Sequence, residues 1–372
     1  MKDYGYQPDF ERFRQHIKRQ SVPGPVPIAE YLVDGPTIEK ITGEKFPSEL
    51  TDGILDWTKL SRTEVKEINA KVADLITKAC LQIGLDYSYV ELDSGLNLVD
   101  SIPFRDDKST EREVWWYIDS HGPIQNWQDF ERFPWPEPQT LDFTTLDIMN
   151  QDLPEGMQIF ILTCGAFDLT SWSMGFENLA VALHDQLELV EAIVDRVSDI
   201  LAYQIETSLQ YDRVGGIWFG DDLGFHSGTL IHPDMIRKII LPHHKRFVKL
   251  AHDRDKLFFL HACGNVGEIM PDIIAMGVDA KHSFEDKILP VEDAYQRWGG
   301  KIGIVGGLDM DLITRGSEEE IRRRTREILD VCGPKGGYAL GTGNSVADYV
   351  PINNFLVMLD EGRRWNQENF PS

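Results

Sequence analysis

Short apolar runs alternate along the chain with longer stretches in which apolar residues recur every three or four positions. The short runs predict strands, and the longer stretches predict amphipathic helices. Predicted strands cover residues 25–32, 87–93, 159–164, 216–222, 257–263, 280–285, 301–309 and 337–344. Predicted helices include residues 61–84, 177–212, 233–253 and a helix that begins at residue 317.

This alternation of eight strands with helices predicts an α/β fold, a (β/α)8 TIM barrel. The first strand is the weakest of the eight, because its prolines cannot donate hydrogen bonds to a sheet. A doubly wound open sheet is the alternative. No predicted strand is followed by a G-x-G-x-x-G turn, so a Rossmann dinucleotide site is not expected.

We expect residues 1–372 to form one barrel domain with two additions. Residues 1–60 form an N-terminal extension that starts with a charged amphipathic helix. Residues 97–155 form an insertion after an early strand and are rich in Trp, Pro and Asp, for example at Trp115-Trp116. Long ordered insertions often shape a substrate mouth. An aromatic cover without substrate contact is the other interpretation.

Polar residues occupy the C-terminal ends of the predicted strands, where a barrel carries its chemistry. In chain order they are Glu91, Asp93, Cys164, Asp221, Asp222, His261, Cys263, His282, Glu285, Asp309 and Asn344. One polar residue at a strand end means little, because strands stop where turns begin. Polar groups at seven of the eight ends predict a shared pocket. His226, in a loop just past Asp222, is a further candidate to reach it.

His261 and Cys263 lie two positions apart at the end of one predicted strand. Because strand side chains alternate with a period of two, the imidazole and the thiol should leave on the same face. These two ligand types suit zinc best among the common metals. A buried cysteine beside a hydrogen-bonded histidine is the alternative, and the position at a strand end favours the metal.

The remaining cysteines and histidines have simpler interpretations. Cys80 and Cys332 lie in or at the end of predicted helices, and we expect both to be packed there. The neighbouring His243 and His244 lie in a helix and are expected to face solvent or to cap it. The four cysteines of the chain are widely separated and do not suggest a disulfide framework.

The chain is acidic, with 37 Lys and Arg against 61 Asp and Glu and a formal charge of −24. Nucleic acids and anionic membranes both reward positive surface, so neither is expected as a partner. The N-terminus lacks the apolar core of a signal peptide, and no stretch approaches the roughly 20 apolar residues of a membrane span. We therefore expect a cytoplasmic protein; a homodimer is left open.

Several motifs resemble the uroporphyrinogen decarboxylase superfamily, which includes the cobamide-dependent methyltransferases. The matching segments are Leu260–Gly264, Gly277–Asp279, Gly307–Asp309, Gly336–Gly341, Gly122–Ile124 and Gly220–Gly224. The resemblance covers most of the chain from about residue 85 onward and implies a (β/α)8 barrel.

The two branches of this superfamily differ in chemistry. Methyltransferases similar to methylcobamide:coenzyme M methyltransferase bind zinc through His-x-Cys and a later Cys, and the metal holds a thiol substrate as thiolate. True decarboxylases use no metal and grip substrate carboxylates through an N-terminal Arg-Gln-Ala-Gly-Arg motif. This chain lacks that motif, and Asn344 stands where the family's later Cys is expected.

The resemblance therefore implies methyl transfer between a small substrate and a corrinoid that a partner protein carries, assisted by zinc. His261 and Cys263 would hold the metal; Glu285, Asp222 and Asp309 are candidate third ligands or general bases, with Glu285 placed first as ligand and Asn344 orienting substrate. Substrate contacts are expected from Glu91, Asp93, Asp221, His226 and His282. Decarboxylation of a porphyrinogen and a non-catalytic barrel that binds a ligand are the alternatives.

Overall fold

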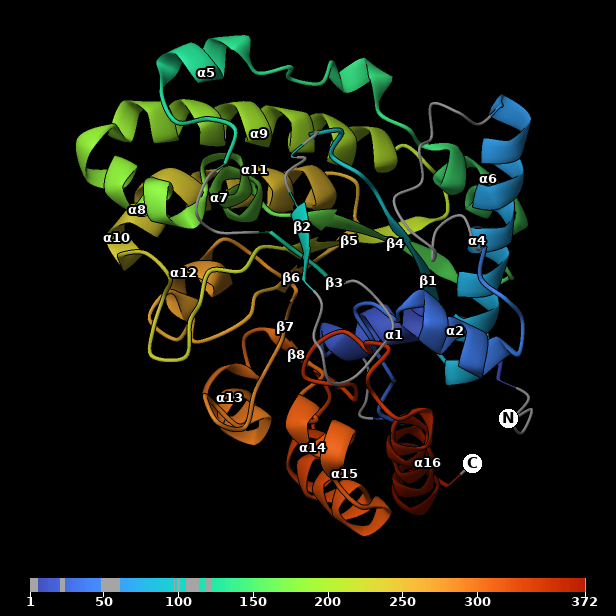
Figure 1. Ribbon diagram of the computed structural model, residues 1–372. Coiled ribbons are helices and arrows are strands. Elements are labelled where there is room, and N and C mark those ends of the chain that lie inside the picture. Colours follow the sequence, from blue (N-terminus) through green and yellow to red (C-terminus); the bar gives the residue numbers. More distant parts are fainter. Residues whose placement is uncertain are drawn as a thin grey trace.

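The computed structural model describes residues 6–20, 24–47, 61–96, 98, 101–104, 114–117 and 122–371. Its centre is a sheet of seven parallel strands in the order β1-β4-β5-β6-β7-β8-β9. The helices lie around this curved sheet (Figure 1). The predicted TIM-barrel-like α/β fold is confirmed.

The strands of the sheet are β1 (Tyr87–Glu91), β4 (Gln158–Cys164), β5 (Val214–Gly220), β6 (Leu257–His261), β7 (Ala280–His282), β8 (Gly303–Val305) and β9 (Tyr338–Ala339). A separate antiparallel pair consists of β2 (Ser101–Phe104) and β3 (Val114–Tyr117). The helices before β4 are α1 (Phe10–Ile17), α2 (Gly35–Thr42), α4 (Arg62–Ile83), α5 (Trp127–Arg132), η2 (Pro138–Thr140) and α6 (Thr144–Asp152). Those after it are α7 (Ala166–Met174), α8 (Phe176–Asp185), α9 (Leu187–Ser208), α10 (Pro233–Met235), η3 (Ile236–Ile240), α11 (Leu241–His252), α12 (Met270–Ala275), α13 (Val291–Trp298), α14 (Met310–Arg315), α15 (Glu318–Cys332) and α16 (Ile352–Asn369).

The first predicted strand, over residues 25–32, is wrong as a regular strand. Its described residues form one isolated parallel bridge, from Ile28 to Leu340, and a second bridge joins Val33 to Val346 just beyond it. The prolines explain the difference, because a residue without an N–H cannot continue a hydrogen-bonded ladder. The segment still occupies the eighth position of the barrel, beside the end of β9.

The other edge of this segment is held by tyrosine side chains rather than by a ladder. The Tyr87 hydroxyl bonds the main-chain N–H and C=O of Glu30, at 2.8 and 2.7 Å. Tyr89 bonds Val33 in the same way, at 3.1 Å for both contacts. Two phenols of β1 thus satisfy the main chain of the segment and close the barrel.

Aromatic side chains fill the lower part of the barrel. Phe13 of α1 is fully buried and its ring lies 5.5 Å from that of Tyr87, 6.3 Å from Phe160 and 6.1 Å from Phe259. Trp218 lies 5.2 Å from Phe259 in the same group. Helix α1 therefore plugs this end of the barrel.

Helix boundaries follow the sequence signals where those signals are strong. The capping boxes of Ser61 with Glu64 and of Ser317 with Glu320 are both formed. The predicted helix over 177–212 is two helices, α8 and α9, which meet at Gln186. The predicted helix over 233–253 contains a π-helical turn, η3, before α11.

The insertion contributes α5, η2 and α6 to the outside of the barrel, and α5 lies over α9 in Figure 1. Residues 1–5, 21–23 and 48–60 of the extension, and much of 97–121, lie outside the described residues, as do the side chains of Trp115 and Trp116. In the parts that are described, no helix combines the length and apolar character that crossing a membrane requires.

Glu30 is a buried carboxyl that ties the eighth position to the end of β9. Its Oε1 accepts the Thr342 N–H at 3.0 Å, and its Oε2 lies 2.6 Å from the Thr342 hydroxyl. That hydroxyl is also in contact with the Asn344 carbonyl. One hydroxyl proton cannot serve two acceptors, so the contacts are all satisfied only when Glu30 is protonated and donates to Thr342. Burial raises the pKa of Glu30 to about 8, which agrees with this state.

Glu30→Gln should therefore change how stability depends on pH. The folded protein holds a proton that the unfolded chain releases near pH 4.5, so the wild type loses stability relative to the variant as pH rises from about 4.5 to about 8. The loss should reach up to about 1.4 kcal/mol per pH unit. Urea unfolding across this range measures the difference between the two proteins, and a constant difference would contradict a protonated Glu30.

Candidate active site

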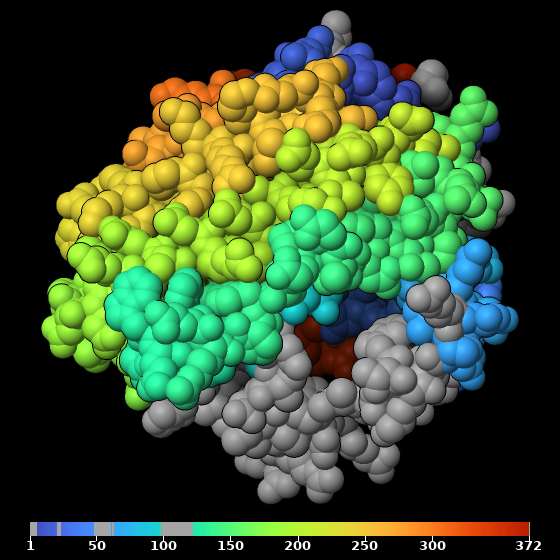
Figure 2. Space-filling model, turned by 90° about the horizontal axis from the view of Figure 1, so that it is seen from above, coloured from blue at the N-terminus to red at the C-terminus, as the bar shows by residue number. Residues whose placement is uncertain are grey.

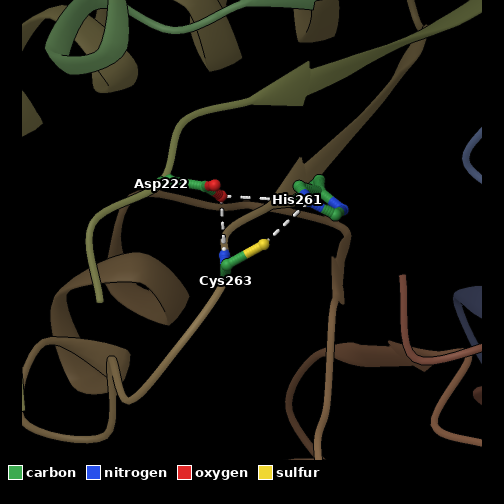
Figure 3. A group of neighbouring side chains, drawn as sticks. All are labelled: Asp222, His261 and Cys263. Atoms are coloured by element: carbon green, nitrogen blue, oxygen red, sulfur yellow. Dashed lines mark hydrogen bonds and ion pairs between the residues drawn. The ribbon is translucent and has the colours of Figure 1, made fainter. Parts of the chain in front are cut away.

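Three potential ligand atoms converge at the C-terminal end of β6. The Sγ of Cys263 lies 3.3 Å from Nε2 of His261, and Oδ1 of Asp222 lies 3.9 Å from the same nitrogen. One ligand atom from each residue falls within 4.8 Å of the others. The Asp222–His261–Cys263 triad comes from the ends of two neighbouring strands, β5 and β6 (Figure 3). His261 is only 6% exposed, whereas the other two are half-buried.

The register of the sheet explains this convergence. His261 pairs with Gly220 on β5 and with His282 on β7, so the chain after Gly220 must leave the sheet beside His261. The main-chain N–H of Cys263 then donates to Oδ1 of Asp222 at 2.8 Å. Gly264 has a φ of 73°, and an added Cβ there would lie 2.3 Å from the main chain of Gly224. Only glycine lets these two loops cross so closely.

The spacing of the triad suits a divalent cation. Zinc bonds of about 2.0–2.3 Å at tetrahedral angles separate ligand atoms by about 3.4–3.6 Å. The 3.3 Å between Sγ and Nε2 is close to this separation, whereas Oδ1, at 3.9 Å from Nε2, would have to move closer by about half an ångström. Imidazole, thiolate and carboxylate together form a set of three protein ligands with one position open, as in catalytic zinc sites.

Burial keeps the thiol and the imidazole of the triad uncharged in the absence of a cation. It raises the pKa of the Cys263 thiol, and the neighbouring Asp222 raises it further. Burial also lowers the pKa of His261 well below its ordinary value, with smaller contributions from His282 and Lys281. A thiol and a neutral imidazole therefore face each other, and a bound cation would favour the thiolate strongly.

Two side chains approach the sulfur of Cys263 from the other side. Nδ2 of Asn344 lies 3.4 Å from Sγ, and the Ser283 hydroxyl lies 3.9 Å from it. Both can donate hydrogen bonds to a thiolate at Cys263 and stabilise its negative charge. Ser283 has a φ of 81°, a conformation that non-glycine residues seldom adopt, and its carbonyl is bonded by the buried ammonium of Lys281.

Asp222 is supported from below by a buried network of acids. Asp168 Oδ2 accepts the Asp222 N–H at 3.1 Å, and burial together with Asp221 raises the pKa of Asp168 well above its ordinary value. Asp221 is fully buried and accepts the N–H of Asp168 at 3.0 Å, at the start of α7. His244 of α11 completes the network with a 2.7 Å bond from Nε2 to Asp221.

Tyr31 covers the triad from the barrel interior. Its ring stacks on His261 with centroids 4.4 Å apart and planes 15° apart. Burial raises the pKa of its hydroxyl well above the ordinary value, and Glu91, Cys164 and Asp168 add to the effect. The described residues make no hydrogen bond to this hydroxyl. A protonated phenol thus lies between the triad and the acidic end of β1.

A cavity of about 560 Å³ lies on the same side of the barrel, large enough for a small molecule. Its wall is mainly apolar, and Asp34, Glu91, Asp93 and Cys164 are the groups in it that carry or can acquire negative charge. Figure 2 shows a hollow on this face, bordered by α4 in light blue, with dark blue N-terminal residues at its base. None of the described lining residues is Lys, Arg or His.

The structure brings some of the predicted site residues together and separates others from them. Asp222, His261 and Cys263 meet, with Asn344 and His282 in contact with them. Glu91 and Asp93 line the cavity, and Asp221 is a buried support rather than an accessible group.

The remaining predicted residues do not join the triad. Glu285, placed first as third ligand, lies outside it and lines a small separate pocket with Lys281. Asp309 caps α14 through the N–H of Asp311 at 2.9 Å, so its carboxylate is occupied. His226 is exposed in its loop. Asp222, whose loop crosses over the end of β6, is therefore the carboxylate that could share an ion with His261 and Cys263.

Several residues of the site were missed in the sequence, among them Tyr31, Asp168 and His244. Tyr31 lies in the proline-broken segment, where no periodicity indicated which way it points. Asp168 stands four residues past the end of β4, inside a helix. His244 was expected to face solvent or to cap its helix, and that prediction is wrong, because it lies on the inner face of α11 and is 1% exposed. The two neighbouring acids at the end of β5, Asp221 and Asp222, could have indicated that His244 has a buried carboxyl partner.

Comparisons with known proteins agree with this architecture. A family model described as uroporphyrinogen decarboxylase (URO-D) matches residues 118–365. Among solved structures, a methyltransferase from Methanosarcina mazei is similar with a TM-score of 0.67 and 17% identity, covering 95% of this chain and 98% of the other. A B12-independent methionine synthase from Shewanella sp. W3-18-1, in complex with selenomethionine, has a TM-score of 0.53 and 13% identity over 93% of this chain and 97% of the other. No curated protein matches the sequence.

His244→Phe should destabilise the protein, because Asp221 then keeps a buried carboxylate without its imidazole partner. A hydrogen bond to a charged group contributes about 1.5–3 kcal/mol, and we expect a loss of that size in the free energy of unfolding. His243→Phe, on the adjacent and more exposed position, is the matched control. Unfolding in urea measures both, and equal losses in the two variants would contradict the assigned role of the bond to Asp221.

Proposed function

The chain belongs to the uroporphyrinogen decarboxylase family. On that premise, we propose that it is a methyltransferase. It would transfer a methyl group between a small substrate and a corrinoid that a partner protein carries. The observation that carries the proposal is the Asp222–His261–Cys263 triad at the mouth of the barrel. Barrel enzymes place their chemistry at this end.

Zinc is the cation that fits the triad best. The donor set would combine a soft thiolate, an imidazole and one carboxylate, whose ligand atoms lie within 4.8 Å of one another. When bound, zinc would supply Lewis acidity and hold a substrate thiol or oxygen in its deprotonated, nucleophilic form. A site with one sulfur and one carboxylate is less thiophilic than one with two sulfurs, so oxygen-containing substrates are within its range.

The surrounding residues would orient the substrate and keep water away. Asn344 and Ser283 donate to the Cys263 sulfur and would moderate its charge. Tyr31 keeps its proton and can donate a hydrogen bond to a substrate heteroatom beside the triad. The apolar wall of the neighbouring cavity suits the body of a small organic molecule.

Decarboxylation of a porphyrinogen is disfavoured by charge. Its substrate carries several carboxylates, whereas the described wall of the cavity contributes Asp34, Glu91 and Asp93 and no cation. The chain also carries a formal charge of −24 and lacks an Arg-Gln-Ala-Gly-Arg clamp. Bringing a polyanion to such a mouth would cost electrostatic free energy.

Removing one ligand should weaken the metal site by the loss of one bond to the cation. We expect wild-type protein loaded with zinc and then dialysed to retain about one equivalent. His261→Ala, Cys263→Ala and Asp222→Ala should each retain far less, as measured by plasma emission spectrometry of protein and metal together.

Glu285→Ala is the matched control, because this carboxylate lies outside the triad. Its zinc content should equal that of the wild type. If Glu285→Ala loses zinc and Asp222→Ala keeps it, the third ligand is misassigned. If all four variants match a wild type that binds no zinc, the proposed metal site is wrong.

Methyl transfer itself can be followed with free methylcobalamin in place of the partner protein. The zinc-loaded enzyme should accelerate loss of the methylcobalamin spectrum in the presence of small thiols; the methyl group passes to sulfur and the electron pair stays on cobalt. In the opposite direction, cob(I)alamin should take the methyl group from a methoxylated compound; cobalt supplies the electron pair of the new bond, and the oxygen leaves as the alkoxide or phenoxide. Cys263→Ala should abolish both, whereas turnover of uroporphyrinogen to coproporphyrinogen, without reaction of either corrinoid, would favour decarboxylation.

A further inference from the structure

A chain of buried hydrogen bonds runs from His261 away from the triad. Nδ1 of His261 lies 2.7 Å from Nδ1 of His282, and Nε2 of His282 lies 3.1 Å from the main-chain carbonyl of Thr342. His282 is fully buried. Both histidines lie in strands paired in register, which fixes the distance between their rings.

The carbonyl at the end of this chain determines where the protons lie. A carbonyl oxygen only accepts, so Nε2 of His282 must carry a proton. His282 is fully buried, and no carboxylate of the described residues contacts its ring, so a second proton would place an uncompensated charge in the interior. The ring is therefore neutral, and its Nδ1 has a lone pair. That lone pair accepts from Nδ1 of His261, which must therefore be the protonated nitrogen of that ring. Nε2 of His261 is left with a free lone pair that faces Cys263 and Asp222.

We propose that His282 is a positioning residue that holds His261 in the Nδ1–H tautomer, so that Nε2 is presented to a metal ion before the metal arrives. Ligating histidines generally donate their other N–H to a neighbouring acceptor, which fixes the ring and its tautomer. Here the acceptor is a second imidazole, whose own tautomer is set by the main chain. The inference rests on the proposed function for the identity of the bound ion, but not for the tautomer.

The Thr342 carbonyl is itself held in place. Glu30 binds the Thr342 N–H and hydroxyl, and this links the closing segment of the barrel to His282. Gly306, with a φ of 79°, packs against the same bond; an added Cβ would lie 2.3 Å from the Thr342 oxygen and 2.8 Å from Nε2 of His282. The absence of a side chain at Gly306 leaves room for the carbonyl and the ring to meet.

The tautomer can be read directly in the metal-free full-length protein. Two-bond proton–nitrogen correlation spectra distinguish a protonated from an unprotonated ring nitrogen, and His261→Gln identifies the His261 signals. We expect the Nδ1–H form in the wild type and the appearance of the Nε2–H form in His282→Phe. An Nε2–H tautomer of His261 in the wild type would overturn the proposal.

Zinc affinity, measured by competition with a chromophoric chelator, gives the second readout. His282→Phe should lower it by about 10–100-fold, the usual effect of losing the partner of a ligating histidine. His282→Asn keeps an acceptor near the position of Nδ1 and should recover part of the affinity, and it serves if the Phe variant does not fold. Unchanged affinity and unchanged tautomer in both variants would overturn the proposal.

His16→Phe is the matched control. His16 is also buried and bonds a main-chain carbonyl, that of Tyr338 at 3.0 Å, but it lies in α1 at the other end of the barrel. It should leave both the tautomer of His261 and the zinc affinity unchanged. If the wild type binds no zinc while His261 is Nδ1–H and depends on His282, the metal of the proposed function fails and the positioning role stands.

Discussion

The arrangement of the site depends on the bond between two buried imidazoles, His261 and His282, at the open end of the barrel. Neither ring can be charged at this depth without a large desolvation cost, so each must find a neutral partner. The main chain at Thr342 supplies the last acceptor. Because this carbonyl can only accept, it sets which nitrogen of His282 and which nitrogen of His261 carry protons. It therefore also sets that the lone pair of His261 faces Cys263.

The rest of the fold keeps this bond in place. Aromatic side chains around Phe13 fill the barrel below it and exclude water from that side. The ring of Tyr31 stacks on His261, and Asp168 holds the main chain of Asp222, the third potential ligand. The result is a polar layer with apolar packing on one side and, on the other, a cavity whose mainly apolar wall carries Glu91 and Asp93.

The strands and part of the triad could be predicted from the sequence. The period of each strand shows which side chains share a face, and a parallel barrel brings the C-terminal ends of its strands together. A period of two placed His261 and Cys263 on one face, and strand ends collected the acids around them. The choice among Asp222, Glu285 and Asp309 could not be made, since it depends on how loops cross after the strands end. Tyr31 was hidden because prolines erase periodicity in its segment, and His244 because a helix can turn either face inward.

X-ray absorption at the zinc edge of the zinc-loaded protein counts the sulfur, nitrogen and oxygen ligands of the ion and is the decisive measurement. We expect one sulfur at about 2.3 Å and nitrogen or oxygen ligands at about 2.0–2.1 Å, with the sulfur lost in Cys263→Ala. A zinc ion bound by two sulfurs, or by none, would contradict a site built from Asp222, His261 and Cys263.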